Sequence, residues 1–123
     1  MSARQKTAVR AFITRYKDMI TEFHHGDCEG ADAEAHDIVA EILGVDKIWI
    51  HPPTDTKYRA YKESPHILKD AGYLVRDRHI VNVSTILLAA PKTDKEELRS
   101  GTWTTVRYAR ASARKVIDIV LER

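Results

Sequence analysis

Apolar side chains recur at steps of three and four residues over residues 3–19, the spacing of an amphipathic helix. Short runs that alternate or are continuously apolar are typical of strands. The whole pattern predicts helices over residues 3–19, 31–43, 67–82 and 101–113, strands over residues 20–24, 47–51, 84–90 and 116–120, and loops over residues 54–66 and 92–100. Ser2 is expected to cap the first helix, and Gly44 to end the second.

Alternating strands and helices predict an α/β fold: a Rossmann-like, three-layer domain whose short, mostly parallel sheet of about four strands is flanked by helices. We expect one domain over residues 1–123. The apolar run at residues 84–90 is typical of a strand buried on both faces. Ligands of such sheets bind outside the carboxyl ends of the strands. The segments after His24, His51 and Ala90 should therefore meet at one edge.

Composition narrows the class of protein. Apolar residues make up 43% of the chain and charged residues 31%, as in an ordinary globular protein. The formal net charge is only +2, with no concentrated basic run, which argues against a nucleic-acid partner. The single Cys28 forms no internal disulfide, and no apolar run reaches the length of a membrane span. A cytoplasmic location without a membrane partner is the resulting expectation.

Residues 24–36, HHGDCEGADAEAH, concentrate the candidate chemistry at a turn from strand to helix. A metal site is one hypothesis, with admissible ligands in His24, His25, Asp27, Cys28, His36 and His51. Their spacing matches no known zinc pattern, and adjacent histidines on a strand point to opposite sides. Asp32 and His36 share a helix face, but an acidic first turn and a half-buried packing histidine explain them equally.

Nucleophilic catalysis is a second hypothesis. Cys28 beside histidines at a helix N-terminus would have a lowered thiol pKa. Small cysteines in turns are more often simple packing residues.

A nucleotide-like ligand is the third hypothesis. Gly26 and Gly30 would let the backbone approach a ligand, with free N–H groups of the next helix behind them. The segment Ser100-Gly101-Thr102 repeats this arrangement before another helix. Arg76 would contact phosphate by charged hydrogen bonds and would not be needed for folding. Basic and aromatic residues of the loop at 54–66 would cover the site.

The order of these motifs resembles the SLOG superfamily, which includes the Lonely Guy phosphoribohydrolases and the DNA-processing protein A. The similarity is greatest to small uncharacterised bacterial and phage members. It rests on five segments that together span nearly the whole chain: residues 24–36, His51-Pro52-Pro53, residues 73–81, Ala89-Ala90-Pro91 and SGTWTTVRYAR at residues 100–110. The resemblance implies a Rossmann-like fold and a nucleotide-type ligand.

The residue patterns and the resemblance together predict one ligand site without metal or cofactor. Its expected residues are His25, Gly26, Asp27, Gly30, Ala31, Asp32, His36, His51, Arg76, Pro91, Ser100, Gly101, Thr102 and Thr105. The preferred function is binding of a nucleotide or nucleotide-derived molecule, as a sensor or sequestering protein. The alternatives are an N-glycoside or phosphoester hydrolase using Asp32, His36 or Asp27, and a non-catalytic protein-interaction module.

Two departures from the family change the expectations. The phosphoribohydrolases carry a glutamate in GTxxE, where this chain has Thr105, so hydrolysis by their mechanism is not expected. Relatives also begin with a strand and a GFTGTR-type turn, whereas this chain starts at Met1-Ser2-Ala3. Without that central strand the sheet should close up or leave unpaired edges. A symmetric homodimer is predicted, with apolar surface from Phe12, Ile13, Tyr16, Trp103 and Tyr108.

Overall fold

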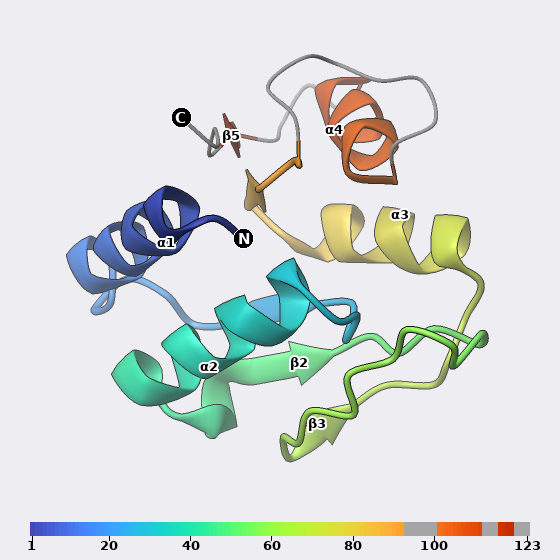
Figure 1. Cartoon of the computed structure of the whole chain (residues 1–123), viewed down its shortest axis with the longest axis horizontal. Helices are drawn as coiled ribbons and strands as arrows, with labels where there is room; N and C mark the ends of the chain where they lie inside the picture. Colours follow the sequence, from blue (N-terminus) through green and yellow to red (C-terminus); the bar gives the residue numbers. More distant parts are fainter. Residues whose placement is uncertain (93–100, 112–115, 120–123) are drawn as a thin grey trace.

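Helices and short parallel strands alternate along the chain in a computed structural model that describes residues 1–92, 101–111 and 116–119 (Figure 1). The elements are α1 Ala3–Arg15, β1 Phe23–His25, α2 Ala31–Leu43, one 3₁₀ turn η1 Val45–Lys47, β2 Ile48–Ile50, β3 His66–Ile67, α3 Tyr73–Val83, β4 Ile86–Ala89, α4 Gly101–Ala111 and β5 Val116–Ile119. The architecture is a small α/β, Rossmann-like fold, which confirms the predicted class.

The described strands form two parallel sheets. In the first, the order is β1-β2-β3, with His25 of β1 opposite Ile50 of β2. In the second, β4 pairs with β5. The sequence predicts about four strands, and the additional one is β3. A strand of two residues is too short to show an apolar pattern.

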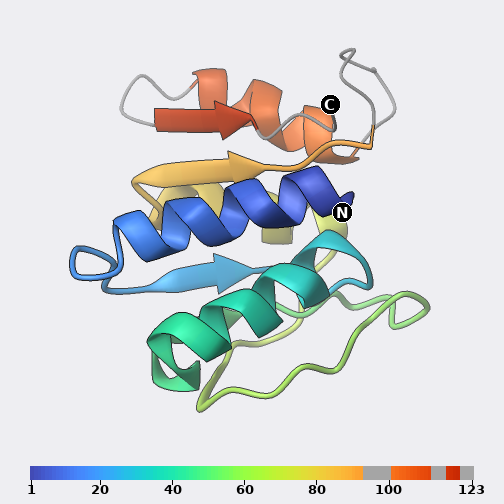
Figure 2. The same cartoon turned by 60° about the vertical axis from the view of Figure 1, so that its left-hand side comes forward.

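Helices pack on the sheets and close two apolar clusters. The larger cluster joins α1 and α2 to β2, and its buried members are Val9, Ile13, Ile38, Val39, Ile48 and Ile50. The smaller one joins α4 to β4 through Ala89, Trp103 and Val106. Figure 2 shows α1 lying across the space between β1 and β4. The core is thus divided between the two sheets.

The first two helices follow their sequence signals closely. A capping box between Ser2 and Gln5 starts α1, as predicted for Ser2. Helix α1 ends at Arg15 rather than at residue 19, because the backbone of Tyr16 leaves the helical region and a turn follows. Helix α2 has the predicted bounds, and Gly44 ends it at φ 89°. No helix in the described part of the chain is long and apolar enough to span a membrane.

The predicted start of the third helix is wrong by six residues. Helix α3 begins at Tyr73 instead of residue 67. The intervening backbone is bonded elsewhere: the N–H of Leu68 donates to the carbonyl of Ile50, and the N–H of Ala71 to the carbonyl of Pro52. These bonds extend the chain beside β2, and a helix cannot form there at the same time.

The predicted burial of residues 84–90 is also wrong. Ile86 is 43% exposed, and only Ala89 of strand β4 is buried. The reason is the division of the sheet, since β4 has β5 on one side and no described strand on the other. Among the described residues, the edge of β4 that faces away from β5 is unpaired.

Candidate functional site

A cavity of about 470 Å³ lies where the carboxyl ends of β1 and β4 meet the starts of α2, α3 and α4. Its wall combines the turn after β1 with polar groups of α3 and α4. Chief among the lining residues are His25, Gly26, Gly30, Asp32, Tyr73, Arg76, Asp77, Gly101 and Thr105. The segments after His24 and Ala90 therefore meet at one edge, as predicted, whereas His51 and the residues that follow it do not line this cavity.

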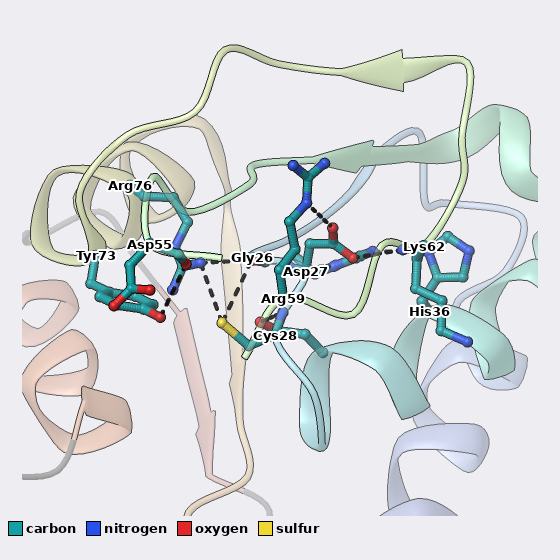
Figure 3. A network of polar contacts seen from close by, with 11 residues as sticks. Gly26, Asp27, Cys28, His36, Asp55, Arg59, Lys62, Tyr73 and Arg76 are labelled. Carbon is teal, nitrogen blue, oxygen red and sulfur yellow. Dashed lines mark hydrogen bonds and ion pairs between the residues drawn. The ribbon is translucent and has the colours of Figure 1, made fainter. Parts of the chain in front are cut away.

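Arg76 fixes the turn that follows β1. Its Nη1 donates to the carbonyl of Gly26 at 2.6 Å and lies 3.5 Å from the Cys28 sulfur (Figure 3). Its Nε donates to Asp77 at 2.8 Å. Arg76 is 6% exposed. Because the guanidinium holds backbone and carboxylate, Arg76 is a positioning residue of this turn. The prediction that the chain folds without Arg76 stays a prediction.

Steric contact with Arg76 explains why residue 26 is a glycine. A Cβ built at Gly26 would lie 2.7 Å from the Arg76 Cζ, closer than real Cβ contacts come. The guanidinium therefore packs directly against the Gly26 backbone. The sequence predicts Gly26 as a residue of the ligand site. In the structure, the absence of a side chain at Gly26 also makes room for Arg76.

Asp27 holds the loop that follows β2. Its buried carboxylate accepts from Arg59 Nε at 3.0 Å and from the backbone N–H of Lys62 at 2.9 Å (Figure 3). Its own backbone is in the left-handed region at φ 56°. The loop thus covers the turn after β1, and Asp27 itself does not line the cavity.

His25 and His36 form a buried pair whose protonation the contacts define. His25 Nδ1 accepts the N–H of Asp27 at 2.9 Å, so its proton sits on Nε2. That Nε2 faces His36 Nδ1 at 2.9 Å and donates to it. Burial, followed by repulsion from His36, lowers the pKa of His25 to about 3. The pair is neutral at physiological pH and joins the end of β1 to α2.

His24 and His51 form a second pair on the other face of β1. His24 Nδ1 lies 2.7 Å from His51 Nε2, and His24 Nε2 lies 2.8 Å from the Glu22 carboxylate. Burial, followed by the neighbouring His24 and His79, lowers the pKa of His51 to about 4. Within residues 1–92, 101–111 and 116–119, no group of three His, Cys, Asp or Glu side chains is arranged to hold a metal ion.

Cys28 has the surroundings of a packing thiol. Its sulfur lies 3.8 Å from the Gly26 carbonyl, and burial raises the pKa of the thiol. The lowered pKa that nucleophilic catalysis requires is therefore absent, in spite of the Arg76 contact.

The N-termini of α2 and α4 both border the cavity. Gly30 is the N-cap of α2 at φ 93°, with no side-chain cap, and the N–H groups of Ala31 and Asp32 have no partner in the described part of the chain. Asp32 instead accepts the N–H of Cys28 at 3.1 Å. Burial raises the pKa of the Asp32 carboxyl. The site thus offers backbone donors beside an acidic group.

The cavity gathers many of the predicted site residues and leaves others outside its wall. Those that line it are His25, Gly26, Gly30, Ala31, Asp32, Arg76, Gly101, Thr102 and Thr105. Four predicted residues are not part of its wall: Asp27, His36, His51 and Pro91. The Pro91 carbonyl accepts from Gln5 at 2.8 Å. Ser100 lies outside the described residues.

Asp77 is the lining residue that the sequence reading missed. Besides its pair with Arg76, it accepts from the Thr105 hydroxyl at 3.3 Å. A carboxylate of α3 therefore lies beside Thr105 of α4. The available signal was its adjacency to Arg76, since the next residue on a helix can reach the same cavity. Comparison with models of protein families, with curated proteins and with solved structures finds no match to this chain.

Proposed function

We propose that the chain binds a nucleotide or nucleotide-derived small molecule in the cavity at the carboxyl ends of β1 and β4. The observation that carries this proposal is the convergence of two helix N-termini and two carboxylates, Asp32 and Asp77, on one cavity. Its volume of about 470 Å³ falls in the range of small-molecule sites.

The polar groups suit the two ends of such a ligand differently. Backbone donors at the starts of α2 and α4 favour a phosphate. The carboxylates of Asp32 and Asp77 accept hydrogen bonds, so they suit ribose hydroxyls or an exocyclic amine. Arg76 already bonds Gly26 and Asp77, so it contributes charge near the phosphate more than direct contacts.

A panel of mono-, di- and triphosphate nucleotides and cyclic dinucleotides tests the proposal. A binder raises the melting temperature in proportion to the logarithm of ligand concentration and releases no product. The absence of any shift across the panel at millimolar concentration would contradict nucleotide binding and favour the interaction-module alternative.

A hydrolase is the second candidate, and the Asp77–Thr105 contact favours it. Asp32 has a raised pKa and can donate a proton, while Asp77 is ion-paired with Arg76 and can act as the base. His36 and Asp27 do not line the cavity, which leaves Asp32 as the candidate named from sequence. Release of free base or of phosphate in the same incubations, lost in Asp77→Asn, would establish hydrolysis.

The homodimer and the SLOG relationship belong to the same proposal, as does a cytoplasmic location in a bacterial or phage setting. Two of the residues expected at a dimer surface, Ile13 and Trp103, are buried within the chain and are not available for it. Helix α3 offers other exposed apolar residues for a dimer contact, namely Leu74 and Val75. Light scattering decides the assembly: a mass of about twice 14.0 kDa supports the dimer, and 14.0 kDa contradicts it.

A further inference from the structure

Helix α3 turns one face toward the ligand cavity, which is the cavity of about 470 Å³ at the carboxyl ends of β1 and β4. Tyr73, Arg76, Asp77 and Ile80 line this cavity, and their spacing of three, four and seven residues places them on one helix face. Tyr73 is the first residue of α3, so Asp77 follows it about one turn, or roughly 5.4 Å, along the axis. The face thus presents an aromatic ring, a cation and a carboxylate to the cavity.

Tyr73 is the one Tyr, Trp or Phe side chain in the wall of the ligand cavity among the described residues. The other rings in the wall are the imidazoles of His24 and His25, which are bonded to further histidines. The Tyr73 hydroxyl lies 3.5 Å from the carbonyl of Asp55, at the limit of a hydrogen bond, so this contact adds little. What Tyr73 offers to the cavity is therefore its ring.

Arg76 packs against the Tyr73 ring and holds it in place. The Arg76 Cζ lies 5.1 Å from the ring centroid, within the range of a cation–π contact (Figure 3). The guanidinium is itself bonded to the Gly26 carbonyl at 2.6 Å and to Asp77 at 2.8 Å. Because the cation is held at two points, the ring that packs on it is positioned before a ligand arrives. Tyr73 is still 38% exposed, which leaves ring surface for a second flat group.

We propose that Tyr73 is the residue on which the base of the bound nucleotide stacks, with the Arg76 guanidinium on the opposite face of the ring. This inference rests on the proposed function and names the residue that selects for an aromatic base. Base stacking on an aromatic side chain tolerates every base, because each base has a π face. The larger rings of purines overlap more of the tyrosine, so the site prefers purines to pyrimidines.

The other groups on α3 follow in the order that a nucleotide requires. Asp77, one turn after Tyr73, accepts hydrogen bonds and suits a ribose hydroxyl. It contacts Thr105 of α4 at 3.3 Å, and Gly101 at the start of α4 lies one turn before Thr105. The phosphate would then bind at the N-terminus of α4, at the end of the ligand away from the base.

Calorimetry with AMP, GMP, CMP, UMP and ribose 5-phosphate tests the stacking role on the full chain. Ribose 5-phosphate has the sugar and phosphate of these nucleotides but no base. Tyr73→Leu should raise the Kd of AMP and GMP about tenfold or more and leave the Kd of ribose 5-phosphate unchanged. Tyr73→Phe keeps the ring and should bind AMP like the unchanged chain.

Tyr58→Leu is the matched control. Tyr58 is 54% exposed and packs on the Lys57 ammonium at 5.2 Å, but it does not line the ligand cavity. Its replacement should leave the Kd of AMP unchanged. A readout that needs no variant is the proton spectrum of AMP bound to the unchanged chain, in which the ring current of Tyr73 should move the base protons upfield.

Three results would overturn the stacking role: base protons that do not move, an equal Kd of AMP for the unchanged chain and Tyr73→Leu, or an equal loss of AMP and ribose 5-phosphate in Tyr73→Leu. The last would give Tyr73 a role in the shape of the site alone. In each case AMP still binds to the unchanged chain, so the proposed function stands. If no nucleotide binds to the unchanged chain, the proposed function fails and the stacking role fails with it.

Discussion

Arg76 Nη1 donates to the carbonyl of Gly26 at 2.6 Å, over a separation of 50 residues in sequence. The bond ties the first turn of α3 to the turn after β1, and a Cβ at Gly26 would occupy the place of the guanidinium. The stability of the fold and the shape of the candidate site therefore depend on the same contact.

Gly26→Ala should reduce the free energy of unfolding by about 1–3 kcal/mol, because the new Cβ displaces Arg76. Urea denaturation measures the loss. Gly72→Ala is the matched control, since a Cβ there meets nothing within 4 Å, and it should change stability by less than about 0.5 kcal/mol.

Arg76→Ala should cost about 2–4 kcal/mol, because it leaves the Gly26 carbonyl and Asp77 without their buried partner. In the Arg76→Ala background, the further change Gly26→Ala should hardly alter the free energy of unfolding, because the steric conflict is gone. Additive losses in the double-mutant cycle would show that the two residues are not coupled.

Asp27→Asn should destabilise the chain by about 2–4 kcal/mol, because Arg59 loses a buried carboxylate partner. Proteolysis of the loop around Arg59 and Lys62 should become faster. Asp37→Asn is the control: it removes an ion pair between exposed Asp37 and Lys62 and should be nearly neutral. Equal effects of the two variants would contradict the role given to Asp27.

The buried histidines should make the fold acid-sensitive. Folding lowers the pKa of His25 from 6.5 to about 3 and that of His51 from 6.5 to about 4. At a pH between the folded and the unfolded pKa of each histidine, the unfolded chain therefore binds more protons than the folded chain. Their contribution is fully present above pH 6.5 and is lost as the pH falls below it, with a slope approaching 1.4 kcal/mol per pH unit for each histidine. Denaturation between pH 5 and 7 measures the slope, and His51→Gln should lower it.

Gly101→Val should abolish ligand binding and leave the fold intact. A Cβ at Gly101 meets nothing within 4 Å, so the protein itself tolerates the side chain. The added bulk would lie at the start of α4, where a phosphate approaches the helix N-terminus. Calorimetry with the nucleotide identified in the panel checks this, and unchanged affinity would place the ligand away from α4.

The local signals in the sequence were sufficient for much of the fold. Ser2 starts α1 and Gly44 ends α2 where predicted, because capping depends on a few neighbouring residues. The alternation of apolar runs also predicts parallel strands with helices between them. These features follow from short-range hydrogen bonding and from burial of one face.

Only the tertiary structure decided the roles within the candidate site. Arg76 and Asp27 are charged residues near glycines in the sequence, which is equally typical of ligand contacts. Their partners are the Gly26 carbonyl and Arg59, 50 and 32 residues away, so no local pattern shows that their charges are already bonded.

The position of β4 shows the same limit for the fold. Its apolar run determines that it is a strand and that it is suited to an interior. Whether its edge is paired depends on which strand lies beside it, and the described strands leave this edge facing β1 across a cavity of about 770 Å³. The apolar pattern is a property of each segment by itself, whereas strand pairing depends on two segments that are distant in the chain.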